Sequence, residues 1–312
     1  MELCSLIVGF PEKIRHSYSA RTPKLKRIFD NIVFVGMGGS YIAGLTFKSM
    51  YEHELKMPID VRHSIKYTNS HTLYVLISYS GNTKEVLNAF KKLKRTHPEN
   101  ILVVSSGGKL IKEAKKRKTE IIKIPEGVHQ RFTFAESFFP LIKIFEKSGY
   151  LTDKKEEIKG IISALKKGTD KVDQGARLLA AKLKDEHPLF YASEYFYPAA
   201  YRFQTALEED AKIIVHSNKI TELFHNELEA LPASYFLPIL IIDDKETKQY
   251  KKQIKYFKKH TKFYLEMGGD NYTKEQRMFL LFYFADFLGY YLSELKMKPF
   301  GETPLSDKIK TK

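Results

Sequence analysis

The sequence predicts an α/β protein with two subdomains, each a mostly parallel sheet flanked by helices. β-branched runs and helical patterns alternate through the first half of the chain, and a second alternation follows in the other half. A polar, charged stretch, TDKKEEIKG at 152–160, separates the two. The 312 residues are enough for two modest domains, each with its own core. We therefore expect domains over residues 1–152 and 153–312.

In the first half, a lead-in helix is expected over residues 11–30, with a proline near its first turn. The alternation that follows is typical of a parallel sheet that binds ligands outside the carboxyl ends of its strands. The expected elements are strand 32–37, helix 40–54, strand 58–64, strand 73–79, helix 83–97, strand 100–106, helix 109–117, strand 120–125 and an apolar helical segment ending near residue 150.

The second half shows a similar alternation, without a short sequence repeat or a low-complexity tract. The segment after residue 295 is expected to form an irregular arm or a short helix. The expected elements are helices near 156–170 and 173–186, strand 188–194, helix 196–210, strand 212–216, helix 221–231, strand 234–243, helix 247–259, strand 262–267 and helix 274–295.

Composition narrows the class of protein. Cys4 is the single cysteine, so an intrachain disulfide and a Cys-based metal cluster within one chain are excluded. Nothing around Cys4 would lower its pKa as a catalytic thiol requires. We find no apolar run that we expect to cross a bilayer, and the first residues lack the features of a signal peptide. We expect a cytoplasmic protein without membrane partners.

The chain is strongly basic, with a net charge of +15, which suits either nucleic acid or an anionic small substrate. Its lysines and arginines are spread along helices, as in KKLKR at 91–95, KEAKKRK at 112–118 and KKQIKYFKKH at 251–260. Each of these segments is typical of a solvated helix face, and no helix-turn-helix, zinc-finger or RNP-like pattern accompanies them. We therefore expect an anionic small substrate rather than nucleic acid.

Two turns rich in Gly, Ser and Thr, GMGGS at 36–40 and SYSGNT at 78–83, each follow a β-branched run and precede a helical pattern. Such turns present backbone N–H groups at a helix N-terminus, which is a site for an anion. The glycines allow a phosphate to approach the backbone, and the hydroxyls can donate to its oxygens. The candidate phosphate-binding residues are Gly36, Gly38, Gly39, Ser40, Ser78, Ser80 and Thr83.

Neither turn matches a nucleotide-binding motif. The first lacks the Lys and the spacing of a P-loop, and Tyr41 stands where a dinucleotide-binding turn requires a third Gly or Ala. Asp60 lies inside its strand pattern rather than after it, where a ribose ligand would be needed. For either segment alone, a turn that serves only packing remains an alternative to anion binding. Two hydroxyl-rich turns in one unit favour anion binding over this alternative.

The second half contains candidate acid–base residues. Glu208, Glu209 and Asp210 close an expected helix, and His216 and His225 follow. An acidic triplet at a helix C-terminus opposes the helix dipole, so it is either a solvated turn or a functional compromise. Spacing alone favours the solvated turn, and a histidine in the middle of TELFHNELEAL is more often half-exposed than catalytic.

Taken together, these segments resemble the bifunctional phosphoglucose/phosphomannose isomerase family of SIS-domain sugar isomerases. GMGGS followed by SYSGNT is the signature of the SIS domain, and the likeness extends through nearly the whole chain. The family has an Arg before the last helix of the first domain, a Glu sixteen residues before a His-Asn pair, and a C-terminal T-P-x-x-x-x-x-K. The matching residues here are Arg131, Glu209, His225, Thr303 and Lys310.

The resemblance implies two SIS-type subdomains and isomerisation of aldose and ketose 6-phosphates through a cis-enediol, without a metal or other cofactor. Glu209 would move a proton between C2 and C1, and Arg131 would stabilise the enediolate. His225 and Lys310 would assist ring opening, and Thr303 matches a position linked to room for both glucose and mannose epimers. The family's His comes from the partner subunit, so a homodimer with a shared site is implied.

The sequence also departs from the family. Glu208 and Asp210 flank Glu209 where the family has asparagines, Phe224 precedes His225 where a second His is common, and HQRFTF surrounds Arg131. A non-catalytic phosphosugar-binding SIS regulatory protein and another SIS enzyme remain alternatives. Singly, Arg131 could cap a helix, Thr303 could be an N-cap and Lys310 could belong to a basic tail.

Overall fold

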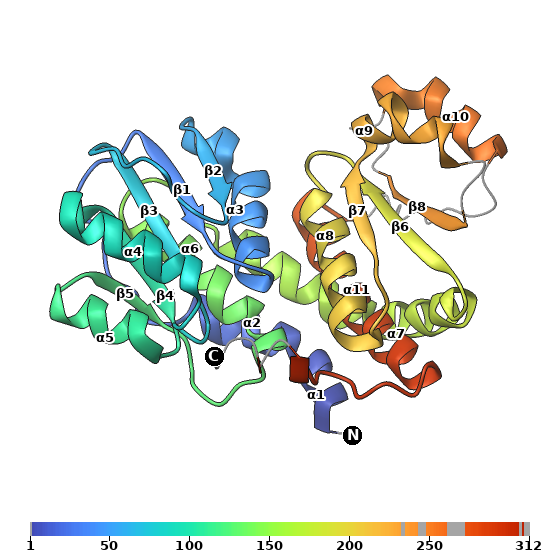
Figure 1. Cartoon of the computed structure of the whole chain (residues 1–312), viewed down its shortest axis with the longest axis horizontal. Helices are drawn as coiled ribbons and strands as arrows, with labels where there is room; N and C mark the ends of the chain where they lie inside the picture. The colour runs from blue at the N-terminus through green and yellow to red at the C-terminus, as the bar shows by residue number, and fades with distance from the viewer. Residues whose placement is uncertain (1, 232–234, 243–247, 261–271, 306–307, 309–312) are drawn as a thin grey trace. The chain divides into compact units, whose positions relative to one another are not determined.

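The computed structural model describes residues 2–231, 235–242, 248–260, 272–305 and 308 (Figure 1). Among these, the chain forms two compact units. The N-terminal unit contains Gly9–Ile162 and the described residues from Thr303 onward, and the C-terminal unit contains Ser163–Glu302 and the residues before Gly9. The domain boundary between residues 152 and 153 stays a prediction.

The N-terminal unit is built on a parallel five-stranded sheet in the order β2-β1-β3-β4-β5 (Figure 1). The strands are β1 (Asn31–Val35), β2 (Ile59–Arg62), β3 (Thr72–Ile77), β4 (Ile101–Ser105) and β5 (Glu120–Lys123). The order reverses between β1 and β3, and open parallel sheets bind ligands at such a switch point. Both predicted phosphate turns follow these two strands, so they lie side by side at the carboxyl edge of the sheet.

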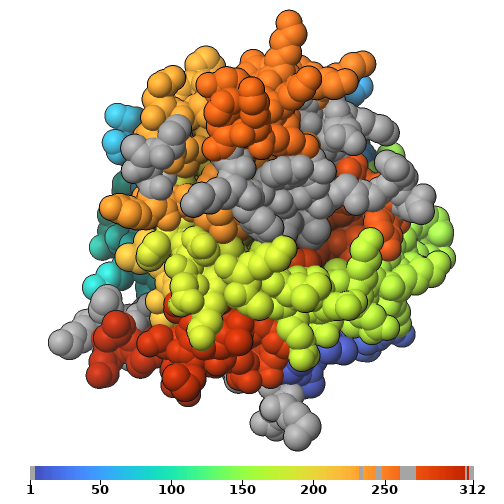
Figure 2. Space-filling view, turned by 90° about the vertical axis from the view of Figure 1, so that its right-hand side faces the viewer, coloured from blue at the N-terminus to red at the C-terminus, as the bar shows by residue number. Residues whose placement is uncertain are grey.

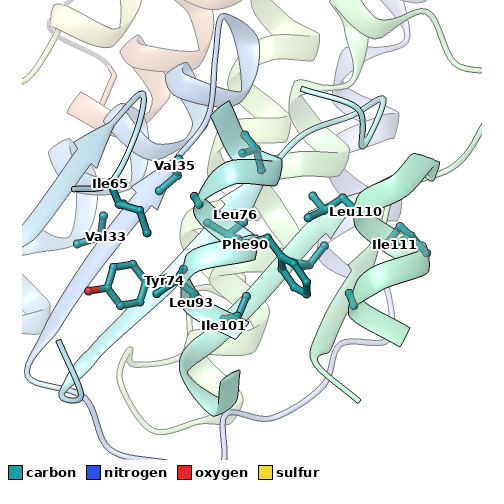
Figure 3. Packing of buried hydrophobic residues seen from close by; sticks show 14 residues of the cluster. Val33, Val35, Ile65, Tyr74, Leu76, Phe90, Leu93, Ile101, Leu110 and Ile111 are labelled. Atoms are coloured by element: carbon teal, nitrogen blue, oxygen red, sulfur yellow. The ribbon is translucent and has the colours of Figure 1, made fainter. Parts of the chain in front are cut away.

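Helices cover both faces of this sheet. On one face, α4 (Lys84–Thr96) and α5 (Gly108–Lys116) pack Phe90 and Leu110 against Val33, Leu76 and other strand residues (Figure 3). On the other face, α3 (Gly39–Leu55) and α6 (Phe134–Lys147) bring an aromatic cluster onto the sheet. The ring centroids of Phe34 and Phe47 lie 5.2 Å apart, and those of Phe47 and Phe145 lie 4.8 Å apart.

The C-terminal unit contains a parallel sheet in the order β7-β6-β8, with β6 (His187–Ala192), β7 (His216–Lys219) and β8 (Phe236–Ile241). On one face, α9 (Ile220–His225) and α10 (Lys251–His260) bury Leu223 and Phe257 against Tyr191 and Leu240. On the other, Phe203 of α8 (Tyr197–Ala206) stacks on Phe190 of β6, with centroids 4.7 Å apart. The predicted α/β class, with two helix-flanked parallel sheets, is thus confirmed.

The alternation predicted for the first half is confirmed to within about two residues at most element ends. The lead-in helix is present with its proline in the first turn, but it ends at Tyr18 and its predicted extension to residue 30 is wrong. Residues 2–18 form α1 (Glu2–Val8) and α2 (Phe10–Tyr18), and no helix continues over 19–30. Pro23 disfavours helical backbone at the residue before it, which explains why the helix does not extend to residue 30.

The predicted break near residue 171 is also wrong, because α7 (Lys155–Leu183) is one continuous helix. Its buried positions stay in phase across the expected break, since Leu165 and Val172 are seven residues apart and both lie in the core. In the space-filling view, α7 lies across the surface of the C-terminal unit, and the basic helix α10 is also exposed there (Figure 2). The exposed lysines of α10 fit the predicted solvated face.

The strand predicted over 212–216 is wrong, because β7 begins only at His216. Lys212 has a left-handed backbone, with φ of 58°, and terminates the preceding helical turn, so residues 213–215 form a connection. The helix predicted over 221–231 is α9 followed by a 3₁₀ turn, Glu227–Glu229. The strand predicted over 262–267 lies outside the described residues.

Helix α11 (Lys274–Leu295) was predicted with these bounds and is the central helix of the C-terminal unit's core. Within the described residues, it is the one helix with the length and mean hydropathy of a membrane span, contrary to our expectation that no run would qualify. Of its most apolar 18-residue window, 78% is buried inside the protein, as in a core helix. Its N-terminus carries a capping box formed by Thr273 and Gln276.

A buried ion pair joins α8 to α11. The Arg202 guanidinium donates to both carboxylate oxygens of Asp286, with Nε to Oδ1 at 3.1 Å and Nη2 to Oδ2 at 2.9 Å. The side chains are 3% and 7% exposed, so neither charge would be solvated if the other were removed.

We therefore expect Asp286→Ala to lower the free energy of unfolding by about 3–5 kcal/mol, because Arg202 would remain buried without its counter-charge. Urea denaturation measures the effect. Glu156→Ala, which removes an exposed pair with Lys159, is the matched control and should cost little. Equal, small losses in both variants would contradict the role given to the buried pair.

Candidate functional site

The first glycine-rich turn runs from the end of β1 into α3. Gly38 has a left-handed backbone with φ of 51°, and Ser40 N–H donates to Met37 O at 3.0 Å. A Cβ on Gly36 would lie 2.9 Å from atoms of Ser40, whereas a Cβ on Gly38 or Gly39 would meet nothing within 4 Å. Gly36 is thus required for packing, and the outer side of the turn, at Gly38 and Gly39, has open space beside the backbone.

The second turn gathers three hydroxyls between β3 and α4. Ser78 Oγ lies 2.8 Å from Thr83 Oγ1 and accepts a hydrogen bond from Gly81 N at 3.1 Å. Ser80 Oγ accepts from Asn82 N at 3.2 Å. Thr83 is the N-cap of α4 and its hydroxyl makes no capping bond. The structure therefore brings Ser78, Ser80 and Thr83 together at the start of α4.

A third small-residue turn, SSGG at 105–108 after β4, supports the second and was missed by the sequence analysis. The backbone at Gly81 lies very close to this third turn. A Cβ added to Gly81 would lie 1.9 Å from Gly107 O. Lys109 N donates to Asn82 Oδ1 at 3.1 Å, and Ser106 Oγ donates to Tyr79 O at 2.6 Å. The signal was present, because the two serines end the strand predicted over 100–106 and the two glycines follow it directly.

Arg131 lies in a 3₁₀ turn, Gln130–Phe132, and is 6% exposed. Its backbone N–H donates to His129 Nδ1 at 3.3 Å, and the hydroxyl of Tyr79 donates to Val128 O. Tyr79 belongs to the second turn, so the segment that carries Arg131 is attached directly to the edge of the sheet where phosphate binding is predicted. Lys13 Nζ holds the other side of the segment by donating to Phe132 O at 3.3 Å.

Glu136, in the first turn of α6, is a second charged residue of this region that the sequence analysis missed. Burial raises the pKa of its carboxyl, although the nearby Lys13 acts in the opposite direction. Within the described part of the chain, Glu136 Oε2 is buried and has no hydrogen-bond partner. Its sequence context, FAESF, gave no sign of this environment.

Glu209 lies in the C-terminal unit, in a π-helical turn, Leu207–Ala211, that directly follows α8. π-helical turns are rare and frequently occur at functional sites. Asp210 is fully buried, and a Cβ on Gly289 of α11 would lie 2.8 Å from Asp210 Oδ2. Glu209 is half-buried, and Lys212 Nζ donates to its backbone oxygen. The acidic triplet is therefore not the solvated turn that spacing alone favoured.

Glu208 occupies a different environment from its neighbour. Gln204 Nε2 donates to Glu208 Oε1 at 3.2 Å, and Ser217 Oγ donates to Gln204 Oε1 at 2.7 Å. Burial raises the pKa of Glu208, and the hydrogen bond from Gln204 partly opposes that rise.

The remaining predicted residues lie as follows. His225 is the last residue of α9 and is exposed, and His216 begins β7 and is also exposed. Thr303 is half-buried and belongs to the N-terminal unit, and Lys310 lies outside the described residues. Glu209 and His225 thus belong to one unit, and the phosphate turns and Arg131 to the other. Within the described ranges, no three His, Cys, Asp or Glu residues group as metal ligands would.

Comparison with known proteins gives the class of this fold. Residues 29–137 match the family described as SIS domain, and residues 172–312 match the family described as bacterial phospho-glucose isomerase C-terminal SIS domain. The C-terminal domain of glucosamine-fructose-6-phosphate aminotransferase from Francisella tularensis superposes with a TM-score of 0.75, at 20% identity, over 96% of this chain and 97% of that one. The fold and its Ser/Gly turns therefore define a SIS-domain protein.

Curated relatives narrow the class further. A bifunctional phosphoglucose/phosphomannose isomerase from Thermoplasma volcanium is 29% identical over 321 residues, covering 99% of each chain. A D-glucosamine-6-phosphate 4-epimerase from Sulfolobus acidocaldarius is also 29% identical, but over 222 residues, covering 69% of this chain and 70% of that protein. The chain thus combines a SIS domain with a bacterial phospho-glucose isomerase C-terminal SIS domain, and over its full length it is similar to bifunctional phosphoglucose/phosphomannose isomerases.

We expect Gly81→Ala to disrupt the phosphate-binding edge. Its left-handed backbone, with φ of 65°, disfavours alanine by about 1–2 kcal/mol, and the overlap with Gly107 O adds to that cost. Urea denaturation and calorimetric titration with inorganic phosphate measure stability and binding. Gly39→Ala is the matched control, because its Cβ enters open space and should leave stability unchanged. Full stability of the Gly81 variant would contradict the close approach of the two turns.

The raised pKa of Glu136 predicts a pH-dependent loss of stability. Its native carboxyl holds a proton more tightly than the unfolded one, so stability is present below the ordinary pKa of 4.5 and falls as pH rises toward the native value. We expect Glu136→Gln to be more stable than the wild type at pH 7, with the difference vanishing near pH 4. Thermal unfolding across this pH range measures it, and a Gln variant that is less stable at pH 7 would contradict the assignment.

Proposed function

We propose that this protein interconverts glucose 6-phosphate and mannose 6-phosphate with fructose 6-phosphate through a cis-enediol intermediate. The observation that carries the proposal is the full-length similarity to a relative named bifunctional phosphoglucose/phosphomannose isomerase. Two further observations support it: the paired Ser/Gly turns at the sheet's switch point, and a half-buried Glu209 on a π-helical turn. The proposed substrate is a phosphosugar, which belongs to the class of anionic small substrates that the basic composition favours.

The phosphate of the substrate would be held by the two turns of the N-terminal unit. Their hydroxyls and backbone N–H groups form hydrogen bonds to phosphate oxygens without requiring a charged side chain. Holding the phosphate at this fixed edge would orient C1 and C2 of the sugar. The proposed contacts are Gly38, Gly39, Ser40, Ser78, Ser80 and Thr83.

The proton transfer would be carried out by Glu209, which removes the proton from C2 of the open-chain aldose and returns it to C1. The negative charge that develops on the enediolate oxygen would be stabilised by the guanidinium of Arg131. His225 and Lys310 would open the ring by moving a proton between the ring oxygen and O1, and Thr303 would leave room for both epimers at C2. No step in this mechanism requires a metal or another cofactor.

We further propose a homodimer in which His225 serves the site of the partner subunit. The exposed position of His225 at the end of α9 supports this, because its side chain is accessible to a second copy. A cytoplasmic location and a role in glycolysis and gluconeogenesis follow from the same proposal. Neither nucleic acid nor a membrane is needed as a partner.

The decisive test couples fructose 6-phosphate formation to a detectable reaction, with glucose 6-phosphate and mannose 6-phosphate offered separately in the presence of EDTA. We expect turnover of both. Glu209→Gln should lower kcat by about 10²–10⁴-fold and still bind the sugar phosphate, because it removes only the base. Glu229→Gln, an exposed carboxyl of the same unit, is the matched control and should behave as the wild type.

Other outcomes would distinguish the alternatives. Binding of both sugar phosphates without any turnover would favour a non-catalytic SIS regulatory protein. Turnover of glucose 6-phosphate alone would restrict the enzyme to one epimer. Failure with both substrates, together with conversion of D-glucosamine 6-phosphate at C4, would favour the activity named for the Sulfolobus acidocaldarius relative. Wild-type turnover by Glu209→Gln would show that the base lies elsewhere.

A further inference from the structure

The carboxylate of Glu227 is held by two hydrogen bonds from neighbouring strands. The hydroxyl of Tyr191, in β6, donates to Glu227 Oε2, and Asn218 Nδ2, in β7, donates to Glu227 Oε1 at 2.6 Å. Tyr191 and Asn218 are register partners in the parallel β6/β7 pair. Each oxygen of the carboxylate thus has its own donor, and both donors are fixed by one point of the sheet.

Glu227 follows His225 by two residues and begins the 3₁₀ turn after α9. The residue between them, Asn226, is also fixed: its N–H donates to Glu222 O at 3.0 Å, and its Nδ2 donates to Glu222 Oε2 at 3.1 Å. On the C-terminal side of His225, Asn226 is therefore attached to α9, and Glu227 is attached to the sheet. Leu223, two residues before His225, is fully buried in the core.

The hydrogen bonds to Glu227 are of the strong, charge-assisted kind, and Tyr191 is 1% exposed. Burial raises the pKa of Tyr191 well above its ordinary value, and the hydrogen bond to Glu227 raises it further. The phenol consequently stays protonated and donates throughout the pH range of an enzyme assay. His225 is exposed, and within the described residues its side chain has no hydrogen bond or ion pair. The position of its backbone, and so the origin of its side chain, is the part that Glu227 fixes.

We propose that Glu227 is a positioning residue for His225, and that Tyr191 and Asn218 hold its carboxylate so that the imidazole is presented at a fixed point. The inference rests on the proposed function, in which His225 moves protons during ring opening. Proton transfer requires the imidazole within hydrogen-bond reach of the sugar oxygens, and a displacement of about 1 Å can cost about 10²-fold in rate.

The first experiment compares Glu227→Ala, Glu227→Gln and the control Glu229→Gln in the isomerase assay. We expect Glu227→Ala to lower kcat by about 10–100-fold with KM within about twofold, because the phosphate-binding residues are untouched. Glu227→Gln should recover most of the rate, since its amide oxygen accepts from Asn218 and its amide N–H₂ donates to the Tyr191 oxygen. A kcat of Glu227→Ala within about twofold of the wild type would overturn the proposal.

Tyr191→Phe tests the hydrogen bond itself, and as a single variant it keeps the proposal testable if Glu227→Ala does not fold. Where Glu227→Ala does fold, the two changes form a double-mutant cycle. Tyr191→Phe keeps the ring in the core and removes only the donor. We expect it to lower kcat by about 3–10-fold in the wild-type background and to have no further effect in the Glu227→Ala background. We call the hold of Tyr191 and Asn218 on the Glu227 carboxylate the clamp. Unchanged turnover by Tyr191→Phe, or independent effects of the two changes on kcat, would count against the clamp.

Hydrogen exchange measured by mass spectrometry on peptides covering residues 220–229 separates this inference from the proposed function. Exchange should rise in Glu227→Ala and Tyr191→Phe and stay unchanged in Glu229→Gln, whether or not the protein is an isomerase. If the wild type shows no isomerase activity and exchange rises as expected, the clamp stands and the proposed function fails. If the wild type turns over and exchange is unaltered in both clamp variants, the clamp fails and the function stands.

Discussion

The close approach of two backbone segments, at Gly81 and Gly107, is the constraint on which the proposed phosphate-binding edge of the sheet depends. β3 and β4 are adjacent parallel strands, so the turns that follow them leave the sheet side by side. A Cβ at Gly81 would overlap the carbonyl of Gly107, so only glycine permits this contact. Leu110 N–H also donates to Gly81 O at 2.9 Å, and the start of α5 thereby supports the turn that precedes α4.

In the C-terminal unit, too, a glycine makes room for a neighbouring group, here the side chain of Asp210 beside Gly289. Gly289 leaves room on α11 for Asp210, and with Asp210 turned into the core the π-helical turn presents Glu209 in a less buried position. The Arg202–Asp286 pair, on the same two helices, fixes α8 against α11 immediately before that turn. A substitution that alters the packing of α11 would therefore change the position of Glu209, even though the substituted residue does not contact Glu209.

Much of this architecture could be predicted, because the alternation of strand and helix patterns is a local property of the sequence. The bounds of α11 and the two Ser/Gly turns were predicted in this way. The error in the strand predicted over 212–216 arose where tertiary packing overrides local pattern. AKIIV at 211–215 has strand propensity, but the π-helical turn and the left-handed Lys212 occupy that part of the chain and β7 begins at His216. Likewise, no local pattern relates Glu227 to Tyr191, which lies thirty-six residues away.

Glu208 and Glu209 show why neighbours in sequence need not share a chemical role. Glu208 receives a hydrogen bond from Gln204, which is fixed by Ser217 of β7, and its burial raises its pKa. Glu209 is the next residue of the same π-helical turn, and Lys212 Nζ donates to its backbone oxygen. The carboxyl of Glu208 is thus engaged by Gln204 within the C-terminal unit, so it does not have to share the role proposed for Glu209. The replacement of a family asparagine by Glu208 is thus compatible with a base at position 209, because the fold keeps the additional carboxyl partly buried and hydrogen-bonded.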